Sequence, residues 1–256
     1  MFNLRKLVKL LNRFLKPVGI SVSKVGYNPS TFRQHIELLA YSGSNREWQQ
    51  LAMYSQVMSL TKDVPGDVIE FGVASGTSFS SLVRLNDILN ASRDGVLSKK
   101  RVLGFDSFEG LPELDQQVDL ATNEAKNAED MQAGGFDSSQ RLSDLESFVS
   151  KYKNCSLHKG WFKDSLSTYI VNNPHASFSL IHIDCDLYES TRDALEPTLM
   201  RLNPGGVILF DEVFHPAFPG ETQAFFEVVQ EFSDSFNYEF QRVEFMPWKW
   251  FLRRIK

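Results

Sequence analysis

The chain of 256 residues is 42% hydrophobic and 23% charged, a composition typical of a globular protein with one large domain and extensions. Its formal net charge of -5 provides no overall attraction to nucleic acid, so we expect no nucleic-acid partner. No stretch approaches the roughly 20 consecutive apolar residues that a membrane-spanning helix needs. Cys155 and Cys185 are too few for a disulfide framework or a zinc site, and we interpret them as small buried residues of a protein in a reducing compartment.

The amino terminus predicts a basic amphipathic helix over residues 2–16, within a helical extension that covers residues 1–62. One face of this helix is apolar, and the other carries Arg5, Lys6, Lys9, Arg13 and Lys16. These charges interrupt any signal-peptide core, which indicates a cytoplasmic protein. We expect the helix to pack on its own domain or on a second subunit of a homo-oligomer, with peripheral contact to an anionic membrane surface as the alternative.

Strands and helices alternate through a main domain that is expected to span residues 63–256. The expected strands cover residues 67–71, 101–105, 156–158, 178–183 and 206–210, and the expected helices cover residues 46–60, 77–90, 141–152, 164–171, 190–202 and 221–233. The Asn-Pro-Gly-Gly turn signal at 203–206 is expected to end the helix before the last of these strands. This pattern predicts an α/β fold with a mostly parallel sheet and helices on both faces, and the tail, 238–252, adds a final antiparallel pair at one edge.

A long acidic segment, residues 110–139, separates the second strand from the helix that follows it. It has few apolar residues and contains Gly134-Gly135. Loops of this length in a compact domain are usually functional lids or disordered segments. We therefore expect a lid in this part of the chain.

Two acidic clusters are the most informative feature of the chain. Asp184-Cys185-Asp186 and Asp211-Glu212 each follow a short apolar run that predicts a buried parallel strand. The carboxyl ends of such strands are where open α/β sheets bind their ligands. Crowded carboxylates cost free energy unless a cation, a proton or a positive ligand compensates them. The sequence therefore predicts that something positive is bound at this edge of the sheet.

A glycine turn after the first strand points to the kind of ligand. Gly72 and Gly76 would let the backbone approach a ligand at the start of the next helix, and Glu70 precedes them. The turn is not G-x-G-x-x-G and has no Walker lysine, which argues against nicotinamide cofactors and ATP. Glu70 suits a ligand with an ammonium or sulfonium group, and Asp106 at the next strand end suits the hydroxyls of a ribose. Together they indicate S-adenosylmethionine, with a structural turn and a loop cap as the competing interpretations.

The sequence resembles the macrocin O-methyltransferase family, metal-dependent class I methyltransferases that act on sugar hydroxyls of macrolides and related glycosides. The resemblance spans residues 64–232 and rests on five segments: 64–73, 104–112, 159–162, 184–191 and 204–211. Among them, Asp-x-Asp-Leu-Tyr-Glu-Ser-Thr at 184–191 is highly specific. The resemblance implies a Rossmann-like class I methyltransferase fold, with an antiparallel edge strand added to the mostly parallel sheet. It also implies that residues 110–139 form the mobile lid of the family.

Residue roles follow from the resemblance, position by position. The implied S-adenosylmethionine site consists of Glu70, Gly72, Val73, Gly76, Thr77, Ser78, Asp106, Ser107, Trp161 and Asp184, with Trp161 near the adenine. Asp184, Asp211 and Glu212 would hold Mg²⁺ or a similar divalent cation, because hard cations take oxygen ligands. Asp186 would be the general base that accepts the proton of an acceptor hydroxyl whose pKa the metal lowers.

The second acidic cluster departs from the family pattern. The family usually has two aspartates there, whereas this chain has Asp211-Glu212 followed by Val213 in place of a tyrosine. Glutamate reaches one methylene further, so coordination would survive with altered geometry, or the change would reflect another ion or a reshaped acceptor pocket. Helix caps and solvated turns are the interpretation of these acids that involves no metal.

Two histidines and one helix start complete the candidate residues. His182 lies inside an apolar strand, where a satisfied core histidine is the usual finding. His215 follows the second acidic cluster and is the better candidate for a catalytic role near the acceptor. Residues 220–223 begin a helix where the family often contacts the metal or the acceptor, with helix capping as the alternative.

These observations predict an S-adenosylmethionine-dependent, divalent-metal-assisted O-methyltransferase. Its expected acceptor is a sugar hydroxyl on a glycoside, a surface glycan precursor or a secondary metabolite, so the expected partner is a small molecule or a glycan. The alternatives are methylation of a catechol or another small phenol, and a non-catalytic scaffold that binds S-adenosylmethionine.

Overall fold

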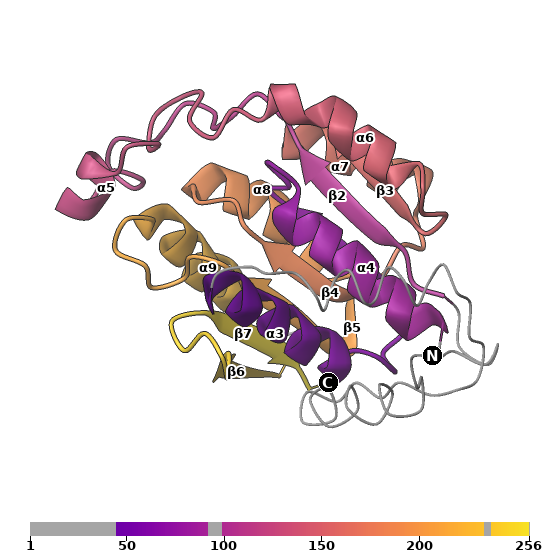
Figure 1. Ribbon diagram of the computed structural model, residues 1–256. Coiled ribbons are helices and arrows are strands. Elements are labelled where there is room, and N and C mark those ends of the chain that lie inside the picture. The colour runs from indigo at the N-terminus through magenta and orange to yellow at the C-terminus, as the bar shows by residue number, and fades with distance from the viewer. Residues whose placement is uncertain (1–44, 92–98, 233–236, 256) are drawn as a thin grey trace.

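The computed structural model of the chain describes residues 45–91, 99–232 and 237–255 (Figure 1). The helix expected over residues 2–16 lies outside the described residues, so its packing, the homo-oligomer and the membrane contact stay predictions. The helices are α3 (Asn45–Leu60), α4 (Thr77–Ala91), α5 (Asn123–Asn127), the 3-10 helix η2 (Ser139–Arg141), α6 (Leu142–Val149), α7 (Phe162–Asn172), α8 (Tyr188–Leu199) and α9 (Pro219–Glu231). The strands are β1 (Asp67–Phe71), β2 (Val102–Asp106), β3 (Cys155–Lys159), β4 (Phe178–Ile183), β5 (Leu202–Phe210), β6 (Tyr238–Arg242) and β7 (Trp250–Arg254).

These strands form one sheet in the order β3-β2-β1-β4-β5-β7-β6. Strands β1 to β5 pair in parallel, and β7 pairs antiparallel with both β5 and β6. The expected mostly parallel sheet is confirmed, and the tail supplies the expected final pair. The antiparallel strand β7 lies one position in from the edge, and β6 is the edge strand. Because β1, β2, β4 and β5 run in the same direction, the segments that follow them meet at one rim of the sheet.

Helices cover both faces of the sheet, and the buried apolar residues divide into two clusters accordingly. Along β1, Val68 faces the cluster that α3, α4 and α6 complete, while Ile69 faces the cluster formed with α7, α8 and α9. The alternation follows from the period of two of a strand. Helix α3 falls within the expected extension before residue 63, yet its Met53 and Val57 are fully buried on the sheet beside α4 (Figure 1).

The largest boundary difference from the sequence-based expectation lies between α8 and β5. The helix expected over residues 190–202 is α8, which ends at Leu199, and Leu202 already pairs with Phe178 at the start of β5. The turn signal at 203–206 is therefore wrong as a helix terminator. It forms an irregularity inside β5, across which the register shifts between Phe178 and Leu180. Proline and glycine are tolerated there because such irregularities leave the backbone partly outside the hydrogen-bonded ladder.

Residues with left-handed backbone torsions gather where the strands end. Ala74 has φ 44°, Phe108 59°, Asp186 64° and Phe214 68°, and they follow β1, β2, β4 and β5, respectively. Non-glycine residues rarely adopt this region, and such strain persists only where the surrounding structure holds it. The same rim of the sheet is thus conformationally strained on four adjacent strands.

The segment expected to be a lid, residues 110–139, contains the short helix α5 and extends away from the sheet (Figure 1). One residue that anchors this segment is Asp119, which is only 2% exposed. One oxygen of Asp119 accepts the backbone N–H of Tyr188 at 2.8 Å, and the other accepts that of Asp115 at 2.8 Å. The segment therefore provides the carboxylate at the amino terminus of α8, where the helix dipole favours negative charge.

Gly72 is the position where the sheet tolerates no side chain. Its φ is +89°, and a Cβ atom there would lie 1.8 Å from the carbonyl oxygen of Asp184. This glycine was expected to let a ligand approach, whereas the group that approaches it most closely is the backbone of the neighbouring strand end.

We expect Gly72→Ala to lower the free energy of unfolding by at least about 2 kcal/mol, because left-handed strain adds to a backbone clash. Gly134→Ala is the matched control: Gly134 has φ +78°, but no atom of the described residues lies within 4 Å of the place that a Cβ atom would take there. The control should lose only about 1 kcal/mol. Urea denaturation of both variants measures the difference, and equal losses would contradict the close approach.

Candidate active site

A cleft of about 860 Å³ opens at the carboxyl ends of β1, β2, β4 and β5. The predicted site residues that line it are Gly72, Asp106, Ser107, Trp161, Asp184, Asp186, Asp211, Glu212 and His215. They come from segments far apart in the sequence, which the parallel sheet brings to a common rim. The cleft is therefore the candidate active site.

The remaining predicted residues lie elsewhere. Gly76, Thr77 and Ser78 line a second cavity of about 490 Å³ between α3, α4 and α6. Val73 is 1% exposed and packs in the core. Glu70 is completely buried and does not line the cleft. Their roles in binding a cofactor stay predictions.

Asp106 is held rigidly at the edge of the cleft. One carboxylate oxygen accepts the N–H of Ala74 at 2.7 Å, and the other accepts that of Phe108 at 2.6 Å. Burial raises the pKa of Asp106, and the hydrogen bonds from Ala74 and Phe108 oppose this shift. The two oxygens offer about four acceptor positions, and the backbone N–H groups of Ala74, Phe108 and Val73 use no more than three of them, which leaves room for a ligand hydroxyl. Trp161, at the start of α7, is 41% exposed and lines the same cleft, which leaves ring surface for an aromatic ligand.

Glu70 and His182 form a buried polar pair beneath the rim. They are register partners on β1 and β4, and Nδ1 of His182 lies 2.9 Å from Oε1 of Glu70. Which of the two atoms donates in this bond depends on the tautomer of His182. Tyr54 of α3 packs edge-on against the His182 ring, with 5.5 Å between ring centroids. His182 is therefore a core histidine, as expected, although its Nε2 has no hydrogen-bond partner in the part of the chain that the structure describes.

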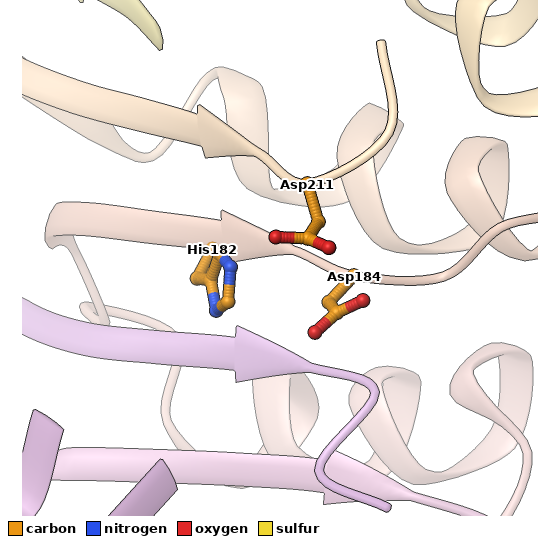
Figure 2. Close-up of side chains that lie close together, drawn as sticks. All are labelled: His182, Asp184 and Asp211. Atoms are coloured by element: carbon orange, nitrogen blue, oxygen red, sulfur yellow. The ribbon is translucent and has the colours of Figure 1, made fainter. Parts of the chain in front are cut away.

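The two acidic clusters meet beside this pair. Ligand atoms of His182, Asp184 and Asp211 all lie within 4.8 Å of one another (Figure 2). Burial raises the pKa of Asp184 well above its ordinary value, and the charges of Asp211 and Asp186 raise it further. Burial and the charge of Asp211 raise the pKa of Asp186 to about 7, although Lys249 opposes this shift. Protons therefore compensate part of the crowded negative charge at this rim.

Lys249, which the sequence patterns did not single out, compensates another part of the negative charge at this rim. Its Nζ lies 2.7 Å from Oδ2 of Asp211 and 3.1 Å from Oε1 of Glu212, and the residue is only 4% exposed. Burial alone would raise the pKa of Asp211, but Lys249 and His182 outweigh it and lower that pKa. Burial, followed by the charge of Asp211, raises the pKa of Glu212 to about 8 despite Lys249.

The expected magnesium site can be compared with this arrangement. Asp184 and Asp211 offer the hard oxygen ligands that such an ion prefers. Glu212 does not join them, because its carboxylate faces Lys249, and the nearest third ligand atom belongs to His182. The set Asp184, Asp211 and Glu212 therefore does not fit a divalent cation while Lys249 holds its position.

The segment after β5 is organised by the start of α9. Glu221 is completely buried, and its Oε1 accepts the backbone N–H of Glu212 at 2.9 Å. The hydroxyl of Thr222 accepts the N–H of Phe214, also at 2.9 Å. These side chains bind the loop after β5 and do not cap α9, whose N-cap residue Phe218 makes no side-chain capping hydrogen bond within the described residues. Contact of residues 220–223 with a metal or an acceptor stays a prediction. His215 lines the cleft, and its Nδ1 accepts the backbone N–H of Ala217 at 3.2 Å and lies 3.8 Å from Oε2 of Glu212.

The strand order and the rim cleft define a class I, Rossmann-like methyltransferase fold. The same fold occurs in the crystal structure of CalS11, a calicheamicin methyltransferase, with a TM-score of 0.67 and 22% identity over 91% of this chain and 99% of that one. A model of the family described as Macrocin-O-methyltransferase (TylF) matches residues 39–237. The chain therefore belongs to the macrocin O-methyltransferase family, and the match begins before α3.

Two curated relatives are similar over part of their length. The 8-demethyl-8-(2,3-dimethoxy-alpha-L-rhamnosyl)-tetracenomycin-C 4'-O-methyltransferase of Streptomyces olivaceus is 33% identical over 153 residues, which are 60% of this chain and 55% of the relative. The demethyldecarbamoylnovobiocin O-methyltransferase of Streptomyces niveus is 28% identical over 159 residues, 59% of this chain and 53% of the relative. The matched region thus spans about half the length of each relative. Within the described residues, no helix combines the length and apolar character of a membrane span.

The buried Glu70–His182 pair leads to a stability prediction. Glu70→Ala leaves Nδ1 of His182 buried without its hydrogen-bond partner and should lower the free energy of unfolding by about 1–3 kcal/mol. In Glu70→Gln the side-chain amide can still pair with Nδ1, so the loss should stay below about 1 kcal/mol. Urea denaturation of the two variants measures both values. Equal losses would show that the hydrogen bond contributes nothing to the fold.

Proposed function

We propose that this protein is an S-adenosylmethionine-dependent O-methyltransferase that methylates a sugar hydroxyl of a glycoside, a surface glycan precursor or a secondary metabolite. The observation that carries the proposal is the position of Asp186 in the same cleft as Asp106 and Trp161. Burial raises the pKa of Asp186 to about 7. Membership of the macrocin O-methyltransferase family supports the reaction class. The relative named for a rhamnosyl-tetracenomycin supports a sugar as the acceptor.

The cleft offers groups suited to each part of S-adenosylmethionine. The free acceptor positions of Asp106 would receive the ribose hydroxyls, and the exposed ring of Trp161 would pack on the adenine. When bound, the cofactor supplies a methyl group on a positively charged sulfur, so transfer breaks the sulfur–carbon bond and forms an oxygen–carbon bond. Asp211, whose pKa Lys249 and His182 lower, keeps a negative charge at the rim that would favour the positive sulfur.

Asp186 is proposed as the general base. Its left-handed backbone, with φ 64°, turns the chain between β4 and α8 and places this residue at the cleft. Burial and Asp211 raise the pKa of Asp186 to about 7, and a base with a pKa near the working pH transfers protons effectively. As the acceptor oxygen forms its bond to the methyl carbon, its proton passes to the Asp186 carboxylate. His215, in the segment that follows β5, is the second candidate for contact with the acceptor.

The assistance of a divalent metal ion in the methyl transfer stays a prediction. Asp184 and Asp211 would contribute oxygen ligands, and the bound ion would lower the pKa of the acceptor hydroxyl. The engagement of Glu212 with Lys249 argues against the three-carboxylate site. The proposed roles of Asp106, Trp161 and Asp186 do not depend on the ion.

Calorimetry with S-adenosylmethionine tests the cofactor. We expect one binding site per chain and an affinity about 10-fold or more weaker in Asp106→Asn, because the amide changes one ribose acceptor into a donor. Asp164→Asn removes a carboxylate that also lines the cleft and serves as the matched control. If the wild-type chain binds no S-adenosylmethionine, the proposed function is wrong.

Methyl transfer from labelled S-adenosylmethionine to nucleotide sugars, glycolipids and phenols tests the acceptor class. With the acceptor so identified, Asp186→Asn should lower kcat by about 10²–10⁴-fold while S-adenosylmethionine still binds. Asp193→Asn, which alters another acid of the same cleft, should lower kcat far less. Transfer only to phenols would favour the catechol-type alternative, and an unchanged kcat in Asp186→Asn would remove this residue as the base.

A further inference from the structure

The acidic rim of the cleft contains a cation that belongs to the chain itself. Lys249 is 4% exposed, and a lysine is rarely buried to this extent without a partner of opposite charge. Its ammonium bridges two carboxylates, with 2.7 Å to Asp211 and 3.1 Å to Glu212. Both carboxylates line the cleft, and Lys249 is not among the residues that line it. The lysine therefore contacts two of the predicted metal ligands without lining the cleft itself.

The position of Lys249 is fixed by the last strand and by the turn before it. In the antiparallel register of β5 and β7, Phe210 pairs with Trp250, so one further step along both strands places Asp211 opposite Lys249. The backbone N–H of Lys249 donates to Met246 at 2.8 Å. The carbonyl of Lys249 accepts the N–H of Val243 at 3.0 Å. The ammonium is therefore held at the second acidic cluster by the sheet itself.

The residues around the turn anchor it further. Val243 and Met246 are each 1% exposed and pack in the same core cluster as α3. Next to Lys249, Trp250 stacks on Phe240, with 4.7 Å between ring centroids and 9° between ring planes. Moving Lys249 out of the cluster would thus disturb a buried turn and an aromatic stack as well as break two ion pairs.

A divalent cation at Asp211 and Glu212 would compete with this ammonium. The ion needs direct contact with oxygens that already accept N–H bonds from Lys249, and two cations so close repel each other strongly at a buried site. The departure from the family pattern is consistent with this competition. Glu212 is one methylene longer than aspartate, and its carboxylate reaches Lys249.

We propose that Lys249 is the resident cation of the second acidic cluster, where its ammonium takes the place that a divalent ion would occupy between Asp211 and Glu212. Lys249 is a positioning residue, because it acts on the cleft through these two carboxylates. The inference rests on the proposed function only in assigning the cleft to methyl transfer. The competition between lysine and metal is a property of the folded chain alone.

Titration of the full chain with Mn²⁺, followed by the electron paramagnetic resonance signal of the free ion, tests this competition without cofactor or acceptor. In Lys249→Met, we expect Mn²⁺ to bind about 10-fold or more tightly than in the wild type, because the competing cation is gone. Lys249→Arg keeps the charge and should bind Mn²⁺ as weakly as the wild type. Lys163→Met removes a lysine that lines the same cleft but acts on Asp193, and should change the affinity less than about twofold.

Thermal unfolding of the same proteins provides a second readout. Mn²⁺ should raise the melting temperature of Lys249→Met, whose two carboxylates have lost their partner, and leave that of the wild type unchanged. If Lys249→Met folds only when Mn²⁺ is present, the proposal is supported in the same way. If Lys249→Met folds neither with nor without Mn²⁺, the Mn²⁺ titration of the wild type tests the proposal instead. Tight wild-type binding that Asp211→Asn abolishes would overturn the proposal. Lack of such binding would support it.

Equal Mn²⁺ affinity in the wild type and in Lys249→Met would overturn the proposal. If that shared affinity is high and His182→Gln abolishes it, the ion binds on the His182 side of Asp184 and Asp211. Failure of the proposed methyl transfer would alter none of these titrations, so the two proposals fail separately.

Discussion

The close approach of two backbones determines the geometry of the cleft. β1 and β4 run side by side to the rim of the sheet, and there the Asp184 carbonyl occupies the space that a side chain of residue 72 would need. The same pairing places Glu70 opposite His182, two residues before Gly72 and Asp184, respectively. It also places Asp184 at the cleft and Asp186 in the turn with a left-handed torsion that follows β4. Any change that separates these two strand ends would displace the buried polar pair and both acids together.

Crowded negative charge at this rim is relieved in three different ways. Protons are favoured on Asp184, Asp186 and Glu212, whose pKa values burial raises. A buried ammonium lies against Asp211 and Glu212. The proposed cofactor would add a positive sulfur when it binds. The site therefore needs an external ion less than the number of its carboxylates implies. The second acidic cluster differs from the first because a buried lysine is paired with it.

The sequence predicts most of this architecture because the signals for it are local. Alternating strands and helices, the glycine turn after β1 and the acids after β4 and β5 are all properties of short segments. The interaction of Lys249 with Asp211 is different, because it depends on the register between two strands about forty residues apart, which residue spacing does not encode. The only local sign was a lysine between Trp248 and Trp250 in an aromatic tail. The misplaced end of α8 has a similar cause: a proline-glycine turn signal cannot distinguish a helix stop from an irregular strand start.

Asp119 gives the long segment before α6 a thermodynamic connection to the site. Its carboxylate satisfies the first N–H of α8, and that helix begins two residues after the proposed base. Displacing this part of residues 110–139 would therefore leave the first turn of α8 without its cap and promote fraying there. Asp119 thus couples residues 110–139 to the start of α8. Protection of the Tyr188 amide from hydrogen exchange would report whether Asp119 keeps its place.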